Sequence, residues 1–280
     1  MNLIDARQKD FFVKEGYLLL EDFYDVSNEI EPVLRDIHGI IERVALRHGI
    51  EISMPDFSID TFDAGYQELL RLDRTYASEV YDLVKQSPSF LRLICNERAD
   101  RLFRELRGRC MSGIGANSYG IRIDNPNDDK FLAHWHQEFM FQPQSIDGIV
   151  FWTPLLPVTP DLGPVIVLPR SHKDGLCVYA RTKDYAQKQG AYQIGLHREA
   201  SVIANYEQIA PLTKPGDLLL MDFLTIHSSG VNRSDRSRWS VQHRFFNFDD
   251  PVGRKIGWKA SVTTGVRVED VFPDHFLVED

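Results

Sequence analysis

Residues 147–169 read DGIVFWTPLLPVTPDLGPVIVLP, and this stretch decides the fold that the sequence predicts. It holds two short runs rich in β-branched and aromatic residues, at 149–153 and 165–168, with proline, aspartate and glycine between them. Short apolar runs divided by turn-forming residues are typical of β-strands. We therefore expect two short strands here, separated by a turn.

Similar runs flank this stretch on both sides. After Gly115 the chain includes NSYGIRI, AHWHQEFMF, PGDLLLMDF and SRWSVQHRFFNF, each bounded by turn-forming residues. Several short strands at close spacing predict a β-sandwich or a β-barrel. The sequence shows no internal repeat and no low-complexity tract, so one domain is expected.

The first 110 residues read mostly as helix. In NEIEPVLRDIHGIIERVALRHG, residues 28–49, apolar side chains recur every three or four positions, and the pattern returns at 77–108 after a polar loop at 51–65. We expect a single domain over 1–280. In it, a mostly helical part at 1–110 packs on a β core at 111–250, and residues 251–280 form a C-terminal tail.

Composition limits the classes of function. The 280 residues are 43% hydrophobic and 26% charged, which is ordinary for a globular protein. A formal net charge of −9, with dispersed Lys and Arg, argues against nucleic-acid binding. No run approaches the roughly 20 apolar residues of a membrane helix, and the start lacks a signal-peptide pattern. Three cysteines are too few for a disulfide framework. We expect a cytoplasmic protein with a small-molecule partner.

Metal-ligating residue types occur in the run AHWHQEFMF, residues 133–141. In an extended chain, His134, His136 and Glu138 project from one face, which is either a solvated strand surface or a metal site. Farther along, His227 stands where an apolar run gives way to small polar residues. Two histidines and a carboxylate hold one face of iron(II) and leave three positions open. The set His136, Glu138 and His227 therefore predicts an iron site.

The order of these motifs resembles the phytanoyl-CoA dioxygenase (PhyH-like) family of iron(II)- and 2-oxoglutarate-dependent oxygenases. The resemblance is clear from about 117 to 248, and the start FFVKEGYLLLEDF is also similar to the family's start. The matching segments are His136-Gln137-Glu138, Trp152-Thr153, Gly163 to His172, His227, and Arg238, which lies eleven residues beyond His227. The resemblance implies a mainly β fold with flanking helices, the double-stranded β-helix (jelly roll, cupin-like barrel).

The same resemblance implies a reaction and a co-substrate site. Iron(II), with 2-oxoglutarate and dioxygen, would hydroxylate an unactivated C–H bond of a small molecule and release succinate and carbon dioxide. Arg238 falls on the family's arginine, and a guanidinium suits the distal carboxylate of 2-oxoglutarate. Ser229 and Trp152 match positions that contact this co-substrate. Arg233 and Arg236 are the competing anchors, which we expect at the surface.

One departure from the family and several open alternatives remain. Most relatives have Asp where this chain has Glu138, so the metal site must be wider or its ligand bent differently. His134, Arg122 and Arg244 are candidate substrate contacts, although His134 is equally well interpreted as supporting its strand. The alternative functions are a non-catalytic metabolite-binding protein and a metal-dependent hydrolase or isomerase on the same barrel. Oligomeric state is left open by the sequence.

Overall fold

The computed structural model describes residues 2–115, 118–181, 194–259 and 268–278. The largest sheet in this part of the chain has the strand order β1-β8-β4-β10-β2, with β3 also paired to β10. The bounds of these strands are β1 Tyr17–Leu20, β2 Ser112–Ile114, β3 Gly120–Asp124, β4 Ile149–Pro154, β8 Leu218–Asp222 and β10 Arg238–Asn247. Two of the six, β8 and β10, lie within the runs that the sequence marks as strands, and β3 and β4 each extend one residue beyond their runs.

The centre of the large sheet is apolar on both faces. Every residue of β4 and of β8 is buried, and their register pairs Phe151 with Leu220. A strand that is buried on both sides reads as a continuous apolar run, which explains why IVFWTP and LLLMD lack alternation. Other parts of the chain must therefore pack against both faces of the large sheet.

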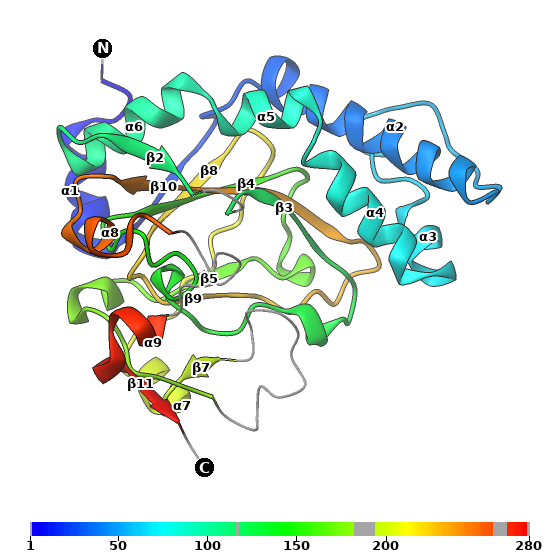
Figure 1. The fold of residues 1–280 in the computed structure, drawn as a ribbon. Coiled ribbons are helices and arrows are strands. Elements are labelled where there is room, and N and C mark those ends of the chain that lie inside the picture. The colour runs from blue at the N-terminus through cyan, green and yellow to red at the C-terminus, as the bar shows by residue number, and fades with distance from the viewer. Residues whose placement is uncertain (1, 116–117, 182–193, 260–267, 279–280) are drawn as a thin grey trace.

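Helices cover one face of the large sheet, and a small sheet lies on the other side (Figure 1). The small sheet pairs β5, Val165–Val167, with β9, His227–Ser229. Gly163 lies just before β5 and has a φ of +74°. A Cβ at this position would lie 2.5 Å from the carbonyl oxygen of Gly230. Glycine therefore lets the backbones before β5 and after β9 meet. The two facing sheets form the predicted jelly roll.

The helices follow the predicted pattern. Their bounds are α1 Ala6–Glu15, α2 Glu31–Arg47, α3 Tyr66–Leu72, α4 Arg74–Val84, α5 Pro88–Ile94 and α6 Glu97–Arg107. The apolar face of the stretch 28–49 is buried. The stretch 77–108 divides into parts of three helices because Ser87 and Asn96 each cap the start of a new one. None of the helices in the described ranges combines the length and apolar character that a bilayer span requires.

Both ends of the chain contribute strands. Within residues 1–110, β1 pairs with β8 and extends the large sheet, while a short π-helical turn, η1 Val26–Ile30, leads into α2. A third sheet has the order β11-β6-β7, with bounds β6 Tyr179–Arg181, β7 Gly195–Leu196 and β11 Phe276–Val278. The remaining helices are α7 Glu199–Ile203, α8 Pro251–Ile256 and α9 Val268–Val271. Of the tail, residues 260–267 and 279–280 lie outside the described residues.

Candidate metal centre

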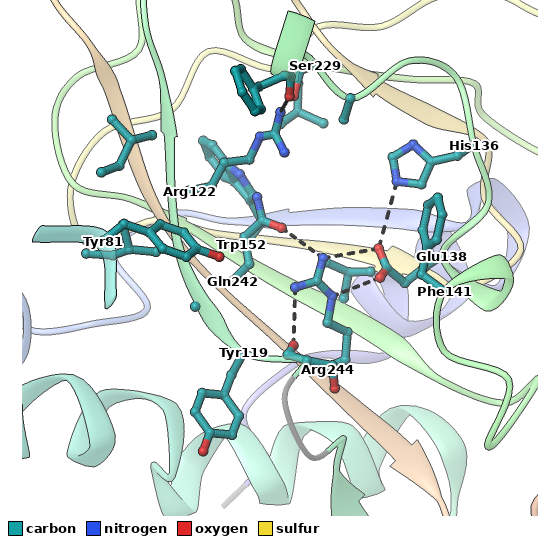
Figure 2. A pocket seen from close by; sticks show the side chains of 18 of the residues that line it. Tyr81, Tyr119, Arg122, His136, Glu138, Phe141, Trp152, Ser229, Gln242 and Arg244 are labelled. Carbon is teal, nitrogen blue, oxygen red and sulfur yellow. Dashed lines mark hydrogen bonds and ion pairs between the residues drawn. The ribbon is translucent and has the colours of Figure 1, made fainter. Parts of the chain in front are cut away.

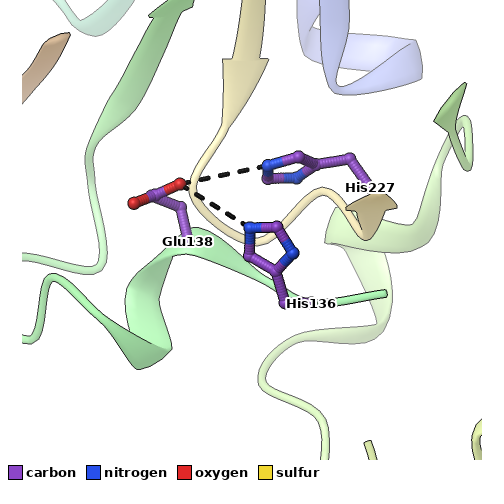
Figure 3. Close-up of side chains that lie close together, drawn as sticks. All are labelled: His136, Glu138 and His227. Atoms are coloured by element: carbon purple, nitrogen blue, oxygen red, sulfur yellow. Dashed lines mark ion pairs between the residues drawn. The ribbon is translucent and has the colours of Figure 1, made fainter. Parts of the chain in front are cut away.

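The prediction that residues 133–141 form a strand is wrong. His136 makes an isolated β-bridge with His227, in which each backbone N–H donates to the other residue's carbonyl at 3.0 Å. Two residues later the chain turns into a short 3-10 helix, η3 Glu138–Met140. His134, His136 and Glu138 thus do not share one strand face. The ligands converge because the bridge places the two histidines side by side while the turn brings Glu138 in from one side (Figure 3).

The three predicted ligands nevertheless lie together. Oε2 of Glu138 is 3.9 Å from Nε2 of His136 and 3.9 Å from Nε2 of His227. The three ligand atoms lie within 4.8 Å of one another, and all three residues are buried. The prediction of a His136, Glu138 and His227 cluster therefore agrees with the geometry.

Backbone carbonyls orient both imidazole rings. Nδ1 of His136 donates to the carbonyl of His134 at 2.7 Å, and Nδ1 of His227 donates to the carbonyl of Thr225 at 2.9 Å. Since a carbonyl only accepts, the proton of each neutral ring lies on Nδ1 and leaves Nε2 free to ligate. Burial lowers the pKa of both histidines, and the neighbouring His227 lowers that of His136 further. Each ring is thus neutral, as a metal ligand must be.

The arrangement fits an iron(II) ion. Two imidazole nitrogens and one carboxylate oxygen on one side are the ligand set that non-haem iron oxygenases use, with the other side left for substrates. Here the open side faces a cavity of about 510 Å³ that all three ligands line. The ion would be held by His136, Glu138 and His227.

Arg244 has a contact at this centre that the sequence analysis did not foresee. It lies on β10 and lines the cavity, as expected of a substrate contact. However, its Nε donates to Oε1 of Glu138 at 3.0 Å and its Nη2 to Oε2 at 3.3 Å (Figure 2). The guanidinium is thus bound to a metal ligand. The polar even-numbered positions of β10 were the sequence signal for this contact, but its partner is 106 residues away.

The cavity is lined by residues of the large sheet, of the small β5–β9 sheet and of the helices α3 and α4. Polar and aromatic side chains line it, among them Tyr81, Tyr119, Arg122, Phe141, Trp152, Ser229 and Gln242 (Figure 2). His134 is not among the lining residues. Its Nε2 instead hydrogen-bonds the carbonyl of Ile194 at 2.7 Å, which favours the supporting role over substrate contact. Arg122 does line the cavity and stays a candidate.

Of the residues expected to hold 2-oxoglutarate, Ser229 and Trp152 line the same cavity as the metal cluster, and Arg238 is not a lining residue but hydrogen-bonds Ser229. Arg238 is fully buried, and its Nη2 donates to Oγ of Ser229 at 3.1 Å. Its Nε and Nη1, like Nε1 of Trp152, have no hydrogen-bond partner among the described residues. Buried donors without partners are rare in folded proteins. A carboxylate of a bound co-substrate fits these donors of Arg238.

Asp124 is a residue of this site that the sequence analysis missed. It stands directly opposite Arg238 across β3 and β10, and it accepts from Nη2 of Arg238 at 2.5 Å and from Nη2 of Arg122 at 2.7 Å. Burial alone would raise the pKa of Asp124, but the two guanidinium groups hold it below its usual range. Asp124 therefore stays ionised and orients both arginines. The alternation of polar residues in YGIRID was the available signal.

The other candidate arginines and histidines lie elsewhere. Arg236 pairs with Asp63 at 2.7 Å, and Arg233 is exposed, so neither reaches the centre. His172 hydrogen-bonds the carbonyl of Val13 at 3.1 Å. His243 is buried, and burial lowers its pKa to about 3. The surroundings of these residues favour structural roles over roles at the metal centre.

Comparison with known proteins places the chain in a family. The model for phytanoyl-CoA dioxygenase (PhyH) matches residues 12–240. A probable phytanoyl-CoA dioxygenase of Caenorhabditis elegans is 22% identical over 256 residues, covering 89% of this chain and 77% of the relative. An ectoine dioxygenase of Sphingopyxis alaskensis is 22% identical over 244 residues, covering 82% of this chain and 71% of the relative.

Solved structures confirm the fold. EctD from Sphingopyxis alaskensis, solved with 2-oxoglutarate and 5-hydroxyectoine, is similar with a TM-score of 0.57 at 18% identity, over 87% of this chain and 76% of that one. The epimerase SnoN, in complex with Fe³⁺, α-ketoglutarate and nogalamycin RO, gives a TM-score of 0.58 at 16% identity, over 88% and 86%. Since the family model spans most of the sequence, the chain belongs to the phytanoyl-CoA dioxygenase family of iron(II)- and 2-oxoglutarate-dependent oxygenases.

Proposed function

We propose that this protein is an iron(II)- and 2-oxoglutarate-dependent dioxygenase that hydroxylates a C–H bond of a small molecule. In the balanced reaction, the substrate, dioxygen and 2-oxoglutarate give the hydroxylated product, succinate and carbon dioxide. The observation that carries the proposal is the buried cluster of His136, Glu138 and His227, which opens on a cavity also lined by Ser229, the hydrogen-bond partner of Arg238.

Arg238 would hold one end of the co-substrate. Its distal carboxylate meets the unpartnered donors of Arg238, with the hydroxyl of Ser229 beside them. Trp152 also lines the cavity and is only 2% exposed, and its unpartnered Nε1 makes it a further candidate contact to the co-substrate. When bound, iron with dioxygen and 2-oxoglutarate supplies the oxidising power that C–H hydroxylation needs.

The protein's own task is to position the substrate and keep water out. A cavity of about 510 Å³ is within the range of small-molecule sites. Tyr81, Tyr119 and Phe141 give it an aromatic lining that suits an organic substrate (Figure 2). Arg122 is the candidate contact for an acidic group of that substrate.

The alternative functions fit the site less well. A hydrolase or isomerase needs a general base, but Glu138 is the only carboxylate among the described residues that line the cavity, and it belongs to the metal cluster. A non-catalytic binding protein has no need of a metal cluster and a co-substrate anchor together. Both features favour the dioxygenase.

We also propose that residues 1–280 form one oxygenase domain that works in the cytoplasm on a small molecule. One hydrophobic cluster joins the helices to the sheets, which supports a single domain. The free thiols of Cys95, Cys110 and Cys177 suit a reducing compartment. The net charge of −9 disfavours nucleic acid as a partner.

Anaerobic spectroscopy tests the proposed function. Protein loaded with iron(II) should develop a weak visible charge-transfer band when 2-oxoglutarate is added, because chelation by the keto acid requires open metal positions. Iron that binds without any such band would contradict the proposal and favour the hydrolase. A band without later succinate formation in air would favour the binding protein.

A further inference from the structure

We propose that Arg244 is a positioning residue that holds Oε1 of Glu138, so that the carboxylate presents only Oε2 to the metal. The inference rests on the proposed function, since it concerns the same metal centre. It assigns Arg244 to the metal ligand, in place of the substrate contact that the sequence suggested.

The two oxygens of Glu138 have different surroundings. Oε2 is 3.9 Å from Nε2 of each of the two histidines, His136 and His227. Oε1 instead accepts from Nε of Arg244 at 3.0 Å. Nη2 of the same guanidinium donates to Oε2 at 3.3 Å, and Figure 2 shows Arg244 and His136 on different sides of the carboxylate.

Arg244 is itself fixed in place. Its Nη1 donates to the carbonyl of Ser118 at 3.2 Å, and its Nη2 donates to Oε1 of Gln242 at 2.9 Å. Its side chain is 16% exposed. A planar guanidinium with partners on several sides has little freedom to turn, so it fixes the plane of the carboxylate.

Such control matters because the ligand is glutamate. Glutamate has one more rotatable bond than aspartate, and a carboxylate can bind a metal through one oxygen or through both. Binding through both would occupy a position that 2-oxoglutarate or dioxygen needs. By engaging Oε1, Arg244 keeps that position open.

The positive charge of Arg244 determines in which direction iron affinity should change when Arg244 is replaced. Glu138 is only 2% exposed, so removing Arg244 leaves a buried carboxylate without this cation and removes a positive charge near the metal. Both changes favour metal binding. Loss of Arg244 should therefore leave iron affinity equal or higher while it weakens 2-oxoglutarate binding. A merely structural role would weaken both.

The experiment compares the wild type with Arg244→Met, Arg244→Lys and the control Arg74→Gln. Arg74 lines the same cavity but pairs with Asp128 at 2.8 Å. Anaerobic titration gives the dissociation constant of iron(II), and the visible band then gives that of 2-oxoglutarate. Arg244→Met should bind iron at least as tightly as the wild type and 2-oxoglutarate about tenfold more weakly, within the range for residues of one hydrogen-bond network.

The other variants separate charge from geometry. Arg244→Lys keeps the charge but not the fork, so it should keep wild-type iron affinity and lose part of the 2-oxoglutarate affinity. Arg74→Gln should change neither constant. Parallel loss of iron and 2-oxoglutarate in the folded Lys variant, or no change in either Arg244 variant, would overturn the assignment while the proposed function stands. A wild type that binds iron but no 2-oxoglutarate would overturn both.

Discussion

Replacing Arg238 by leucine should remove the anchor of 2-oxoglutarate and spare the iron. Nη2 of Arg238 is shared by Asp124 and Ser229, whereas Nε and Nη1 have no partner among the described residues. One of these free donors can make a hydrogen bond to a carboxylate, which contributes about 1.5–3 kcal/mol, and the buried carboxylate also loses the cation that faces it. The loss should cost about 3–5 kcal/mol, or roughly two to three and a half decades in 2-oxoglutarate affinity.

The fold should survive this change. Asp124 keeps Nε and Nη2 of Arg122 as donors, at 2.9 and 2.7 Å, so its buried charge remains paired. Thermal melts check that point. Arg238→Lys should bind 2-oxoglutarate with intermediate affinity because it keeps the charge without the planar, fixed donors of the guanidinium.

The assay is a titration of iron-loaded protein with 2-oxoglutarate under anaerobic conditions, following the visible band. Arg236→Leu and Arg233→Leu serve as matched controls, since Arg236 pairs with Asp63 and Arg233 is exposed. Both controls should bind like the wild type. If Arg238→Leu binds normally and a control shows the large loss, the anchor has been assigned to the wrong arginine.

Three further predictions concern the histidines. His136→Ala and His227→Ala should each lose iron(II) in equilibrium dialysis, while His134→Ala should retain it; the reverse pattern would move the metal site. Burial lowers the pKa of His136 and His227, so both rings stay neutral when the pH falls below 6.5. Iron affinity should therefore persist below pH 6.5. An iron affinity that falls with a midpoint at pH 6.5 would contradict this prediction. Burial lowers the pKa of His243 from 6.5 to about 3. Between pH 6.5 and pH 3 the unfolded state therefore binds more protons than the folded state. The free energy of unfolding should fall as the pH drops through this range. His243→Phe should flatten that fall in denaturant titrations, and an unchanged slope would show that other groups cause it.

The helices and most strands were predictable because their signals are local. The periodicity of residues 28–49 gave α2, and short β-branched runs gave β4 and β8. The run at 133–141 was misread because alternation of polar and apolar residues also suits an irregular segment. A backbone bridge to His227, far along the chain, determines the conformation there.

The site was predictable only in part. Family spacing marked His136, Glu138, His227 and Arg238, since catalytic motifs keep their order along a chain. The pairing of Arg244 with Glu138 joins positions 106 residues apart, and no local pattern reports such a contact. The sequence showed polar positions on β10, but their partners depend on the strand register.

Release of labelled carbon dioxide from 1-¹⁴C-labelled 2-oxoglutarate tests the central claim most directly. With iron(II) and dioxygen, the wild type should release carbon dioxide and form succinate in equal amounts, even without its substrate, and His136→Ala should do neither. Wild-type protein that binds iron(II) and 2-oxoglutarate yet releases no more carbon dioxide than His136→Ala would contradict the assignment as a dioxygenase.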